Sequence, residues 1–399
     1  MSGEDLSPAG NYILCVNAGS STLKASLFEA RADGGVAAVE GRSVTVGRVP
    51  SAEALDEALR ALAVSGPAAI RAVGHRVVHG GTEFREPVLV TAEVKAAIAR
   101  LGVLAPLHNP PALAAMEAAE ARFPGVPHVA AFDTAFFCDL PPEQTVYPLP
   151  WEWHRRWGVR RFGFHGLSHE YCSRRASEML AAVDERRAPA PATAVAGGAS
   201  GARDRVVVLH LGNGCSGSAV VAGKPAATTM GFTPMEGLMM GTRSGSVDPG
   251  ILLYAMREES LTVDELDEAL NDRSGLLGVS EVSGDFRAVE SAARKGHEQA
   301  KLALSIYAAR ARAAVGSLAA AMGGLDALVF TAGVGEHAAS LRADVCRGLE
   351  FLGVFIDLDR NAAATPDADV SLSGPARVLV IQTREDLVLA RAVRRVAGR

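Results

Sequence analysis

A pattern of two short apolar runs separated by a turn of small residues occurs twice in the chain, and it limits the possible folds more than any other feature. The first pair, residues 12–16 and 23–28, flanks the turn NAGSS. The second pair, residues 206–211 and 218–221, flanks the turn GNGCSG. Apolar, partly β-branched runs that stop at such turns are typical of β-strands. Two matching strand–turn–strand units predict an internal duplication.

A third apolar run, residues 327–330, ends in the turn TAGVGE. Several segments between these strands have the apolar spacing and the start signals of helices. We expect helices at 51–63, 92–101, 110–122, 169–182, 262–271, 296–322 and 387–396. Strands that alternate with helices predict an α/β fold built in layers.

Length and composition favour two domains. The chain has 399 residues, whereas single cores stop growing at roughly 250–300 residues. Apolar residues make up 48 %, which excludes disorder of the whole chain. Residues 183–204 are rich in Ala, Pro, Gly and Arg without helical or strand periodicity, and predict a flexible surface insertion.

The charge balance and the cysteines exclude several classes of protein. The 45 acidic and 40 basic side chains give a formal net charge of −5, which argues against general affinity for nucleic acids or anionic membranes. Five scattered cysteines form no CxxC pair, which favours a reducing compartment. The N-terminus carries acidic residues where a secretory signal would not, and no apolar run reaches about 18 residues. We therefore expect a cytoplasmic protein without a membrane segment.

The three turns have the composition of phosphate-binding loops. Small residues after a strand let backbone N–H groups converge on an anion. In the first turn Asn17, Gly19, Ser20 and Thr22 offer donors, and Lys24 adds a point charge. A plain hairpin is the alternative for any one turn, but three such turns favour phosphate binding. The second turn spells GxGxxG, but another strand follows it, whereas a dinucleotide-binding unit requires a helix there.

Nine motifs in this order resemble the acetate kinases of the acetate and propionate kinase family. They are CVNAGSSTLK (15–24), GHRVVHGG (74–81), APLHNP (105–110), FDTAFF (132–137), RRFGFHGLSH (160–169), HLGNG (210–214), MGFTPMEGLMMGTRSG (230–245), SGDFR (283–287) and FTAGVGE (330–336). The resemblance implies two related domains of the actin-like ATPase (ribonuclease H-like) fold with a central cleft. Residues 1–150 with a C-terminal helix at 386–399 would form the acyl-side domain. Residues 151–385 would form the nucleotide-binding and dimerisation domain.

The activity that the resemblance implies is reversible, Mg²⁺-dependent phosphoryl transfer from ATP to acetate, giving acetyl phosphate and ADP by direct in-line displacement. Mn²⁺ is an expected substitute for Mg²⁺, and a homodimer is implied. A propionate or butyrate kinase of the same superfamily is the alternative enzyme. A non-catalytic nucleotide-binding module is the alternative outside enzymes.

Four residues match catalytic positions of the family. Arg76 would bind the substrate carboxylate or the transferred phosphoryl group, since a guanidinium offers a fixed fork of donors. Arg243 would bind the same phosphoryl group from the other domain. His165 would hydrogen-bond the phosphoryl oxygens without becoming phosphorylated. Asp133 would order the acyl group, the metal or the arginines. For each of them the structural alternative is an ordinary salt bridge, hydrogen bond or helix cap.

The acyl group of the substrate would meet Arg76 and a small apolar pocket formed by Val78, Leu107, Phe164 and Pro234. Core packing is the alternative for each apolar residue. A hydrophobic pocket discriminates one methylene by only about 1–3 kcal/mol, so we also expect slower use of propionate.

Asn17 and Glu385 match family positions near magnesium, which typically binds few protein carboxylates and keeps its waters. Glu385 could otherwise be an ordinary acidic residue at a helix start. Nucleotide contacts are implied for residues in all three turns and in SGDFR. They are Ser20, Thr22, Lys24, His210, Leu211, Gly212, Asn213, Gly214, Asp285, Phe286, Arg287, Gly333, Val334 and Gly335.

Four positions depart from the usual family motifs: Ala227, Ser246, His337 and Arg384. Arg384 precedes Glu385, so the new cation could pair with that carboxylate or weaken metal binding. The departures affect the expected metal affinity and nucleotide preference more than the expected reaction.

Overall fold

The computed structural model describes residues 11–19, 22–31, 33, 35–47, 50–64, 67–184 and 204–398. Ser20 and residues 185–203 of the predicted insertion lie outside them. The chain divides into two compact units. Unit 1 comprises the chain up to Cys138 with Phe164–Ser168 and Arg384–Arg399, and unit 2 comprises Asp139–Gly163 and His169–Thr383. The expected division placed these boundaries at residues 150 and 385.

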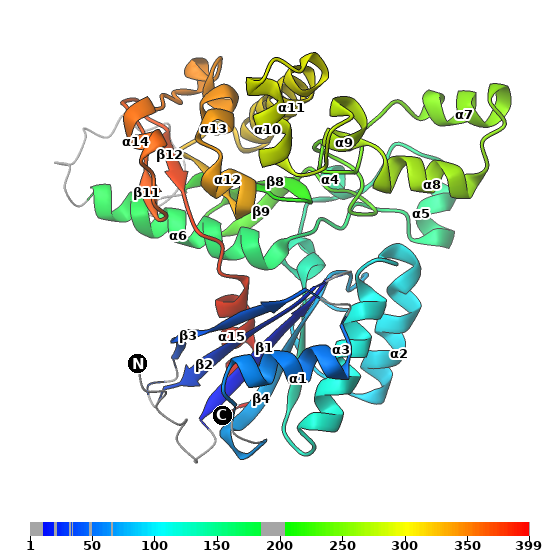
Figure 1. Cartoon of the computed structure of the whole chain (residues 1–399), viewed down its shortest axis with the longest axis vertical. Helices are drawn as coiled ribbons and strands as arrows, with labels where there is room; N and C mark the ends of the chain where they lie inside the picture. The colour runs from blue at the N-terminus through cyan, green and yellow to red at the C-terminus, as the bar shows by residue number, and fades with distance from the viewer. Residues whose placement is uncertain are drawn as a thin grey trace. The chain divides into compact units, whose positions relative to one another are not determined.

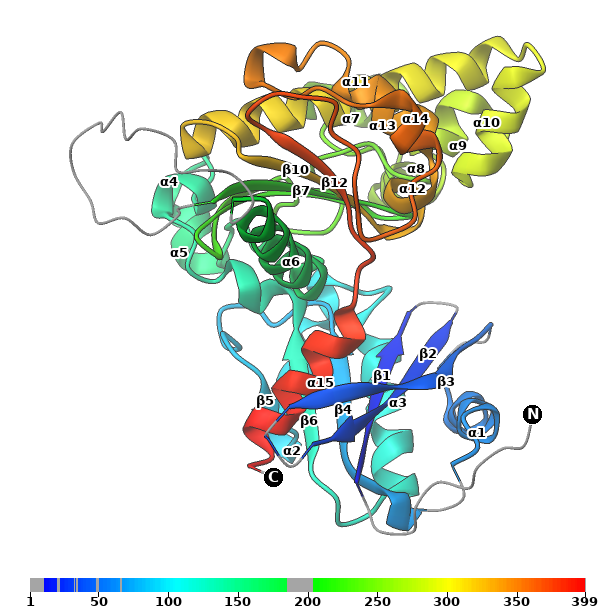
Figure 2. The same ribbon diagram turned by 90° about the vertical axis from the view of Figure 1, so that its left-hand side faces the viewer.

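Unit 1 contains a six-stranded sheet in the order β3-β2-β1-β4-β6-β5 (Figure 1, Figure 2). Its first three strands form an antiparallel meander, β4 and β6 continue the sheet parallel to β1, and β5 closes it as an antiparallel edge. The strands are β1 (Tyr12–Ala18), β2 (Leu23–Ala30), β3 (Val36–Val46), β4 (Ile70–Val77), β5 (Val88–Leu89) and β6 (His128–Phe132).

Unit 2 repeats this topology in the order β9-β8-β7-β10-β12-β11. Again three strands form an antiparallel meander, two more are parallel to the first of them, and a short antiparallel strand lies at the edge. The strands are β7 (Arg205–Leu211), β8 (Cys215–Val221), β9 (Lys224–Thr228), β10 (Ala327–Thr331), β11 (Ala368–Asp369) and β12 (Arg377–Val380). The predicted α/β class and the predicted duplication are therefore confirmed.

Helices cover both faces of the sheet in unit 1. Leu14 and Val16 of β1 pack against buried side chains of α1 and α3. On the other face α15 packs against β1 and β4 (Figure 2). Gly74 of β4 lies against Leu389 and Val393 of α15, where a Cβ atom would not fit. The helices of unit 1 are α1 (Ala52–Ala61), α2 (Ala92–Arg100), α3 (Asn109–Arg122) and α15 (Glu385–Val396), with short 3-10 turns η1 (Pro67–Ala69), η2 (Leu101–Leu104) and η3 (Asp133–Phe137).

Unit 2 is layered in the same way. Cys172 and Ala176 of α6 share a buried cluster with residues of β7, β10 and β12. Leu318 of α11 lies against Gly217 of β8. The remaining elements are α4 (Pro142–Thr145), α5 (Trp151–Trp157), α6 (Gly166–Asp184), α7 (Pro249–Glu258), α8 (Val263–Asp272), α9 (Gly275–Ser280), α10 (Phe286–Arg294), α11 (Glu298–Met322), α12 (Ala332–His337), α13 (Ala339–Cys346), η4 (Glu350–Leu352) and α14 (Leu358–Ala362).

All seven helices expected from the sequence are present, as α1, α2, α3, α6, α8, α11 and α15, with ends that differ by a few residues. The turn GNGCSG leads into β8, so a strand follows it as predicted. Within the described part of the chain, no helix combines the length and the apolar composition needed to cross a membrane.

Candidate active site

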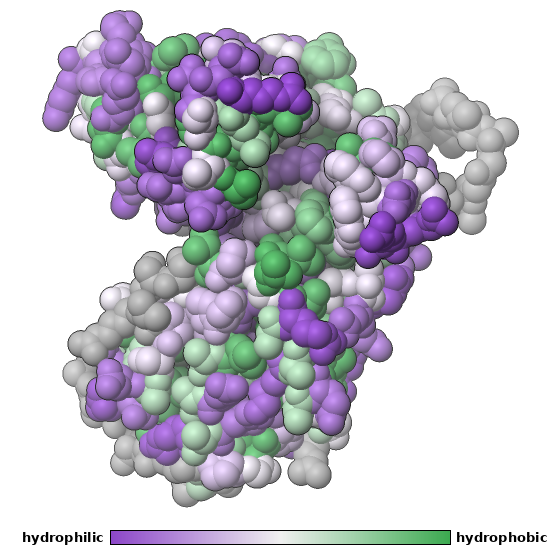
Figure 3. Space-filling view, turned by 90° about the vertical axis from the view of Figure 1, so that its right-hand side faces the viewer, coloured by the Kyte–Doolittle hydropathy of each residue, from purple (hydrophilic) through white to green (hydrophobic). Residues whose placement is uncertain are grey.

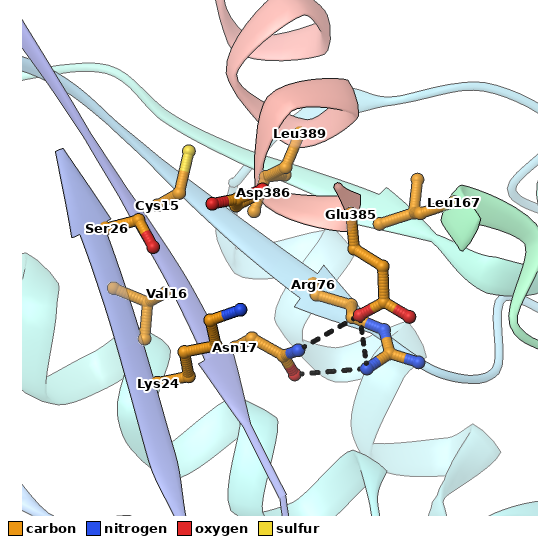
Figure 4. A pocket seen from close by; sticks show the side chains of 10 residues that line it. All are labelled: Cys15, Val16, Asn17, Lys24, Ser26, Arg76, Leu167, Glu385, Asp386 and Leu389. Carbon is orange, nitrogen blue, oxygen red and sulfur yellow. Dashed lines mark hydrogen bonds and ion pairs between the residues drawn. The ribbon is translucent and has the colours of Figure 1, made fainter. Parts of the chain in front are cut away.

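Three of the predicted residues lie side by side on neighbouring strands of unit 1. The register pairs Asn17 of β1 with Lys24 of β2 on one side and with Arg76 of β4 on the other. Directly paired residues project from the same face of a sheet. All three line one pocket together with Glu385 of α15 (Figure 4).

Arg76 is the centre of this cluster. Its guanidinium donates to Asp133 twice, from Nη2 to Oδ2 at 2.7 Å and from Nε to Oδ1 at 3.1 Å. Its Nη1 lies 3.1 Å from Glu385 Oε2 and donates to Asn17 Oδ1 at 3.3 Å. Asn17 Nδ2 in turn donates to Glu385 Oε2 at 3.4 Å. The predicted catalytic pair Arg76 and Asp133 and the predicted metal ligands Asn17 and Glu385 therefore form one hydrogen-bonded group. Figure 4 shows the contacts among Asn17, Arg76 and Glu385.

Asp133 is fully buried at the end of β6, where η3 begins. Burial raises the pKa of its carboxyl group, although the charge of Arg76 and the backbone N–H of His165 oppose this effect. Burial also acts to lower the pKa of Arg76, but the carboxylates of Asp133 and Glu385 outweigh it and raise that pKa. A buried carboxylate bound in this way holds the guanidinium in one orientation.

His165 has a left-handed backbone conformation, with φ of 58°. It precedes Gly166, where an added Cβ atom would overlap the backbone carbonyl oxygen of Asp133. The close approach of the two segments requires glycine at position 166. Because the backbone N–H of His165 also bonds to Asp133, the histidine backbone is fixed against the arginine–aspartate pair.

The residues present fit a magnesium ion by their donor chemistry. Asn17, Asp133 and Glu385 offer only oxygen ligands of the kind that Mg²⁺ prefers, and Mg²⁺ commonly takes only one or two protein carboxylates. Among the described residues no group of three or more His, Cys, Asp or Glu side chains forms a metal site by itself. Phosphate and water oxygens would therefore have to complete the coordination.

Residues from all three nucleotide motifs of unit 2 line one cavity of about 400 Å³. This volume lies in the range of small-molecule sites, about 300–1,000 Å³. The predicted residues in its lining are Gly212, Asn213, Asp285, Phe286, Arg287, Gly333 and Val334. His210, Leu211, Gly214 and Gly335 are close in sequence but are absent from this lining. Thr22 and Lys24 belong to unit 1, where both are exposed.

The SGDFR motif also has a structural role. Asp285 caps α10 by accepting from the backbone N–H groups of Arg287 and Ala288. Phe286 packs edge-on against Tyr307 with ring centroids 5.8 Å apart. The side chain of Arg287 is 89 % exposed and pairs with Asp285 at 3.1 Å. The motif therefore forms a helix cap followed by an exposed arginine, and both residues also line the cavity.

Arg243 and Pro234 lie in unit 2, and Nη1 of Arg243 donates to the carbonyl oxygen of Pro234 at 3.3 Å. Burial lowers the pKa of Arg243, although Asp272 and Cys215 act in the opposite direction. The other predicted acyl-pocket residues belong to unit 1. Among them Phe164 is fully buried with its ring edge-on to His79, Val78 is half-buried, and Leu107 is 41 % exposed.

The four residues that depart from the family motifs differ in their contacts and burial. Nε of Arg384 donates to Asp386 Oδ1 at 3.3 Å, so the guanidinium pairs with its other acidic neighbour instead of Glu385. Ser246 exchanges two hydrogen bonds with Gly237. Ala227 is buried in β9, and His337 lines the nucleotide-sized cavity.

Two residues without a predicted role also hold the site in place. Fully buried Asn109 accepts from the N–H of His79 and donates to its carbonyl oxygen, at 3.1 and 3.0 Å. Thr134 accepts from the N–H of Gly80. Both fix the chain just beyond Arg76 and Val78. Their signal was present, since Asn109 lies in APLHNP and Thr134 in FDTAFF.

Comparison with known proteins is consistent with this geometry. The profile of the acetokinase family matches residues 49–391. The acetate kinase of Gloeobacter violaceus is 52 % identical over 330 residues, which are 82 % of this chain and 77 % of that protein. The acetate kinase of Nostoc punctiforme is 42 % identical over 95 % of this chain and 97 % of its own.

Two solved structures match nearly the whole chain at 35 % identity. The Porphyromonas gingivalis acetate kinase matches with a TM-score of 0.81, and a propionate kinase from Francisella tularensis subsp. tularensis SCHU S4 matches with a TM-score of 0.82. Each comparison covers 97 % of this chain and 100 % of the solved one. The chain has the two-domain actin-like ATPase fold of these structures, and it belongs to the acetokinase family.

Proposed function

We propose that the chain is an acetate kinase that transfers the γ-phosphoryl group of ATP to acetate by direct in-line displacement. A carboxylate oxygen of acetate attacks the γ-phosphorus, the bond to the bridging oxygen of ADP breaks, and acetyl phosphate and ADP are released. The observation that carries this proposal is the cluster of Arg76, Asp133, Asn17 and Glu385 in unit 1. A module that only holds a nucleotide would not need this second charged group.

The side chains fit distinct tasks in such a transfer, which depends on positioning and charge stabilisation more than on covalent intermediates. Arg76, held by Asp133, would bind the acetate carboxylate or the transferred phosphoryl group. His165 would donate to the phosphoryl oxygens, and Arg243 would bind the same group. Asn17 and Glu385 would hold Mg²⁺, which neutralises charge on the phosphate oxygens when it is bound. The cavity lined by Asn213, Asp285 and Gly333 would hold the nucleotide.

A direct assay tests the proposal. Incubation with ATP, Mg²⁺, acetate and hydroxylamine should yield acetyl hydroxamate together with stoichiometric ADP. Arg243→Ala should lower turnover far more than it weakens ATP binding measured by calorimetry. The absence of product with every C2 to C4 acid would overturn the proposed reaction, and unchanged turnover in Arg243→Ala would overturn the role of that arginine.

Propionate kinase is the second candidate, because the Francisella propionate kinase matches this chain as well as the acetate kinase structure does. Specificity constants for acetate, propionate and butyrate decide between the two. Val78→Ala should shift the preference toward propionate by up to about tenfold if Val78 contacts the acyl group. Val103→Ala, at a residue that is 81 % exposed, is the matched control and should leave the preference unchanged.

The homodimer also belongs to this proposal. Helix α7 in unit 2 exposes Ile251, Leu253, Tyr254 and Met256, each between 44 % and 59 % exposed. The view from the right-hand side of Figure 1, where α7 lies, shows hydrophobic patches among hydrophilic ones (Figure 3). Exposed apolar clusters favour protein contacts. Light scattering should give twice the mass of one chain for the wild type, and Leu253→Asp should shift the measured mass toward that of one chain.

A cytoplasmic location remains a prediction from the sequence.

A further inference from the structure

Tyr147, Arg161 and Glu236 form a polar cluster in unit 2 that the sequence motifs did not assign to the reaction. The Tyr147 hydroxyl donates to Glu236 Oε2, and Nη2 of Arg161 pairs with Glu236 Oε1 at 2.7 Å. The Arg161 guanidinium also lies over the Tyr147 ring, 5.3 Å from its centroid. Each carboxylate oxygen of Glu236 therefore has its own donor.

Tyr147 and Arg161 also bind the backbone of the loop at residues 229–237, which follows β9 and carries Glu236 itself. The N–H of Phe232 donates to the Tyr147 hydroxyl at 3.0 Å. Nη1 of Arg161 donates to the carbonyl oxygens of Thr229 and Met230, both at 3.0 Å. The main chain beside Arg161 takes part as well, because the N–H of Phe162 donates to the Gly231 carbonyl at 2.9 Å. Four successive residues of an irregular loop are thus fixed.

The side chains of the cluster are packed tightly against the backbone of the loop at Gly231. A Cβ atom on Gly231 would overlap both Glu236 Oε2 and the Tyr147 hydroxyl. Burial raises the pKa of Tyr147, and although Arg161 opposes this shift, Glu236 adds to it. The hydroxyl therefore stays protonated at neutral pH and can donate to Glu236 while it accepts from Phe232.

The other side of the loop contacts the segment that carries Arg243. The carbonyl oxygen of Pro234 accepts from Arg243 Nη1 at 3.3 Å. Gly237 donates to the Ser246 hydroxyl at 3.0 Å, and its carbonyl oxygen accepts from the N–H of Ser246 at 2.9 Å. The loop is therefore bound by the cluster on one side and binds the Arg243 segment on the other.

We propose that Tyr147, Arg161 and Glu236 are positioning residues that fix the orientation of Arg243 and Pro234 through the 229–237 loop. This inference rests on the proposed role of Arg243 in phosphoryl transfer. Small misplacements of a group that stabilises a transition state cost large factors in rate. The cluster would thus act on turnover without touching a substrate.

The test compares Tyr147→Phe and Glu236→Gln with Tyr171→Phe. Tyr171 is a matched control, because it also carries an arginine over its ring, Arg174 at 5.9 Å, and it packs against the buried cluster that α6 shares with β7, β10 and β12. Tyr147→Phe should lower kcat for acetate by about tenfold or more, with ATP affinity within about twofold of the wild type. Tyr171→Phe should leave both values unchanged.

A double-mutant cycle separates positioning from a general loss of stability. If Tyr147 acts through Arg243, adding Tyr147→Phe to Arg243→Ala should cost no further activity. Additive losses, or a lowered melting temperature with unchanged kcat at a temperature where the variant is folded, would overturn the inference. Glu236→Gln in the same cycle provides the test if Tyr147→Phe does not fold. A wild-type protein that forms no acyl phosphate would overturn the proposed function, whereas an active wild type with a neutral Tyr147→Phe overturns only the positioning role.

Discussion

Arg76 donates two parallel hydrogen bonds to Asp133, from Nη2 at 2.7 Å and from Nε at 3.1 Å, and the carboxylate that receives them is fully buried. Two bonds between a planar guanidinium and a planar carboxylate fix orientation as well as distance. Nη1 of Arg76 is left to face Asn17 and Glu385. The pair therefore sets the direction from which the arginine can meet a substrate.

The first prediction is that Asp133→Asn lowers kcat by about 100-fold or more, because the neutral amide cannot accept both guanidinium bonds. Breaking a buried ion pair on one side also costs about 3–5 kcal/mol of unfolding free energy. ATP affinity should change little, because the nucleotide-sized cavity is lined by residues of unit 2. Stopped-flow kinetics, calorimetry and urea unfolding measure the three quantities.

Asp56→Asn is the matched control for this prediction. Asp56 also pairs with an arginine of unit 1, Arg122 at 3.4 Å, but both side chains are 41 % exposed or more. Exposed pairs contribute only about 0–1 kcal/mol. If Asp56→Asn lowered kcat and the unfolding free energy as much as Asp133→Asn, the predicted importance of the buried Arg76–Asp133 pair would be contradicted.

The second prediction concerns the metal. Glu385→Gln should raise the Mg²⁺ concentration for half-maximal activity by about tenfold, because one anionic oxygen ligand is lost. Arg384→Ala should leave it within about twofold, because Arg384 pairs with Asp386 and not with Glu385. A Mg²⁺ titration of initial rates measures both. A large effect of Arg384→Ala together with no effect of Glu385→Gln would contradict the assignment of Glu385 as the metal ligand.

The sequence predicted much of this arrangement for physical reasons. The strand–turn–strand pattern is local, so it revealed the duplication that the two sheets display. Asn17 and Arg76 were each found by motif, but their contact depends on the parallel pairing of β1 with β4. Parallel register is set by packing of both sheet faces and by long connections, which leave no short-range signal.

Other features lay beyond local patterns. Tyr147 and Glu236 are 89 residues apart, and neither has a neighbour in sequence that would predict their contact. Helix α7 begins at Asp248–Pro249, a cap followed by proline. That start signal is present in the sequence, yet α7 lies outside the seven helices that we expect from the apolar spacing. Arg384 was expected to face Glu385 or to weaken the metal site, and only the side-chain geometry places it on Asp386.

The third prediction concerns Gly166. Gly166→Ala should destabilise the protein by several kcal/mol and abolish activity, because the new Cβ would overlap the Asp133 carbonyl and neither backbone can yield cheaply. Gly316→Ala is the control, since nothing lies within 4 Å of the added atom in the middle of α11. That variant should gain about 0.5–1 kcal/mol, the difference in helix propensity. Thermal unfolding and the hydroxamate assay distinguish the two.

The fourth prediction concerns acid stability and rests on His75. This residue of β4 is buried, stacks on His128 with ring centroids 5.3 Å apart, and shares a 3.0 Å hydrogen bond with it. Burial, with a smaller effect of His128, lowers the pKa of His75 from 6.5 to about 3. The folded state therefore holds the neutral ring, whereas the unfolded chain takes up a proton below pH 6.5.

This difference in protonation means that the unfolding free energy falls as the pH is lowered. The stability contributed by a neutral His75 is fully present above pH 6.5 and is lost as the pH falls toward 3. Between pH 7 and about pH 4.5 the loss from this group should be roughly 3 kcal/mol. His75→Phe keeps a flat ring but cannot titrate. Between pH 7 and about pH 4.5, the unfolding free energy of this variant should therefore fall by roughly 3 kcal/mol less than that of the wild type. The comparison holds whatever unfolding free energy the variant has at pH 7. Urea unfolding at both pH values measures the two differences. An equal fall in wild type and variant would mean that other buried groups, such as His128, carry the acid sensitivity.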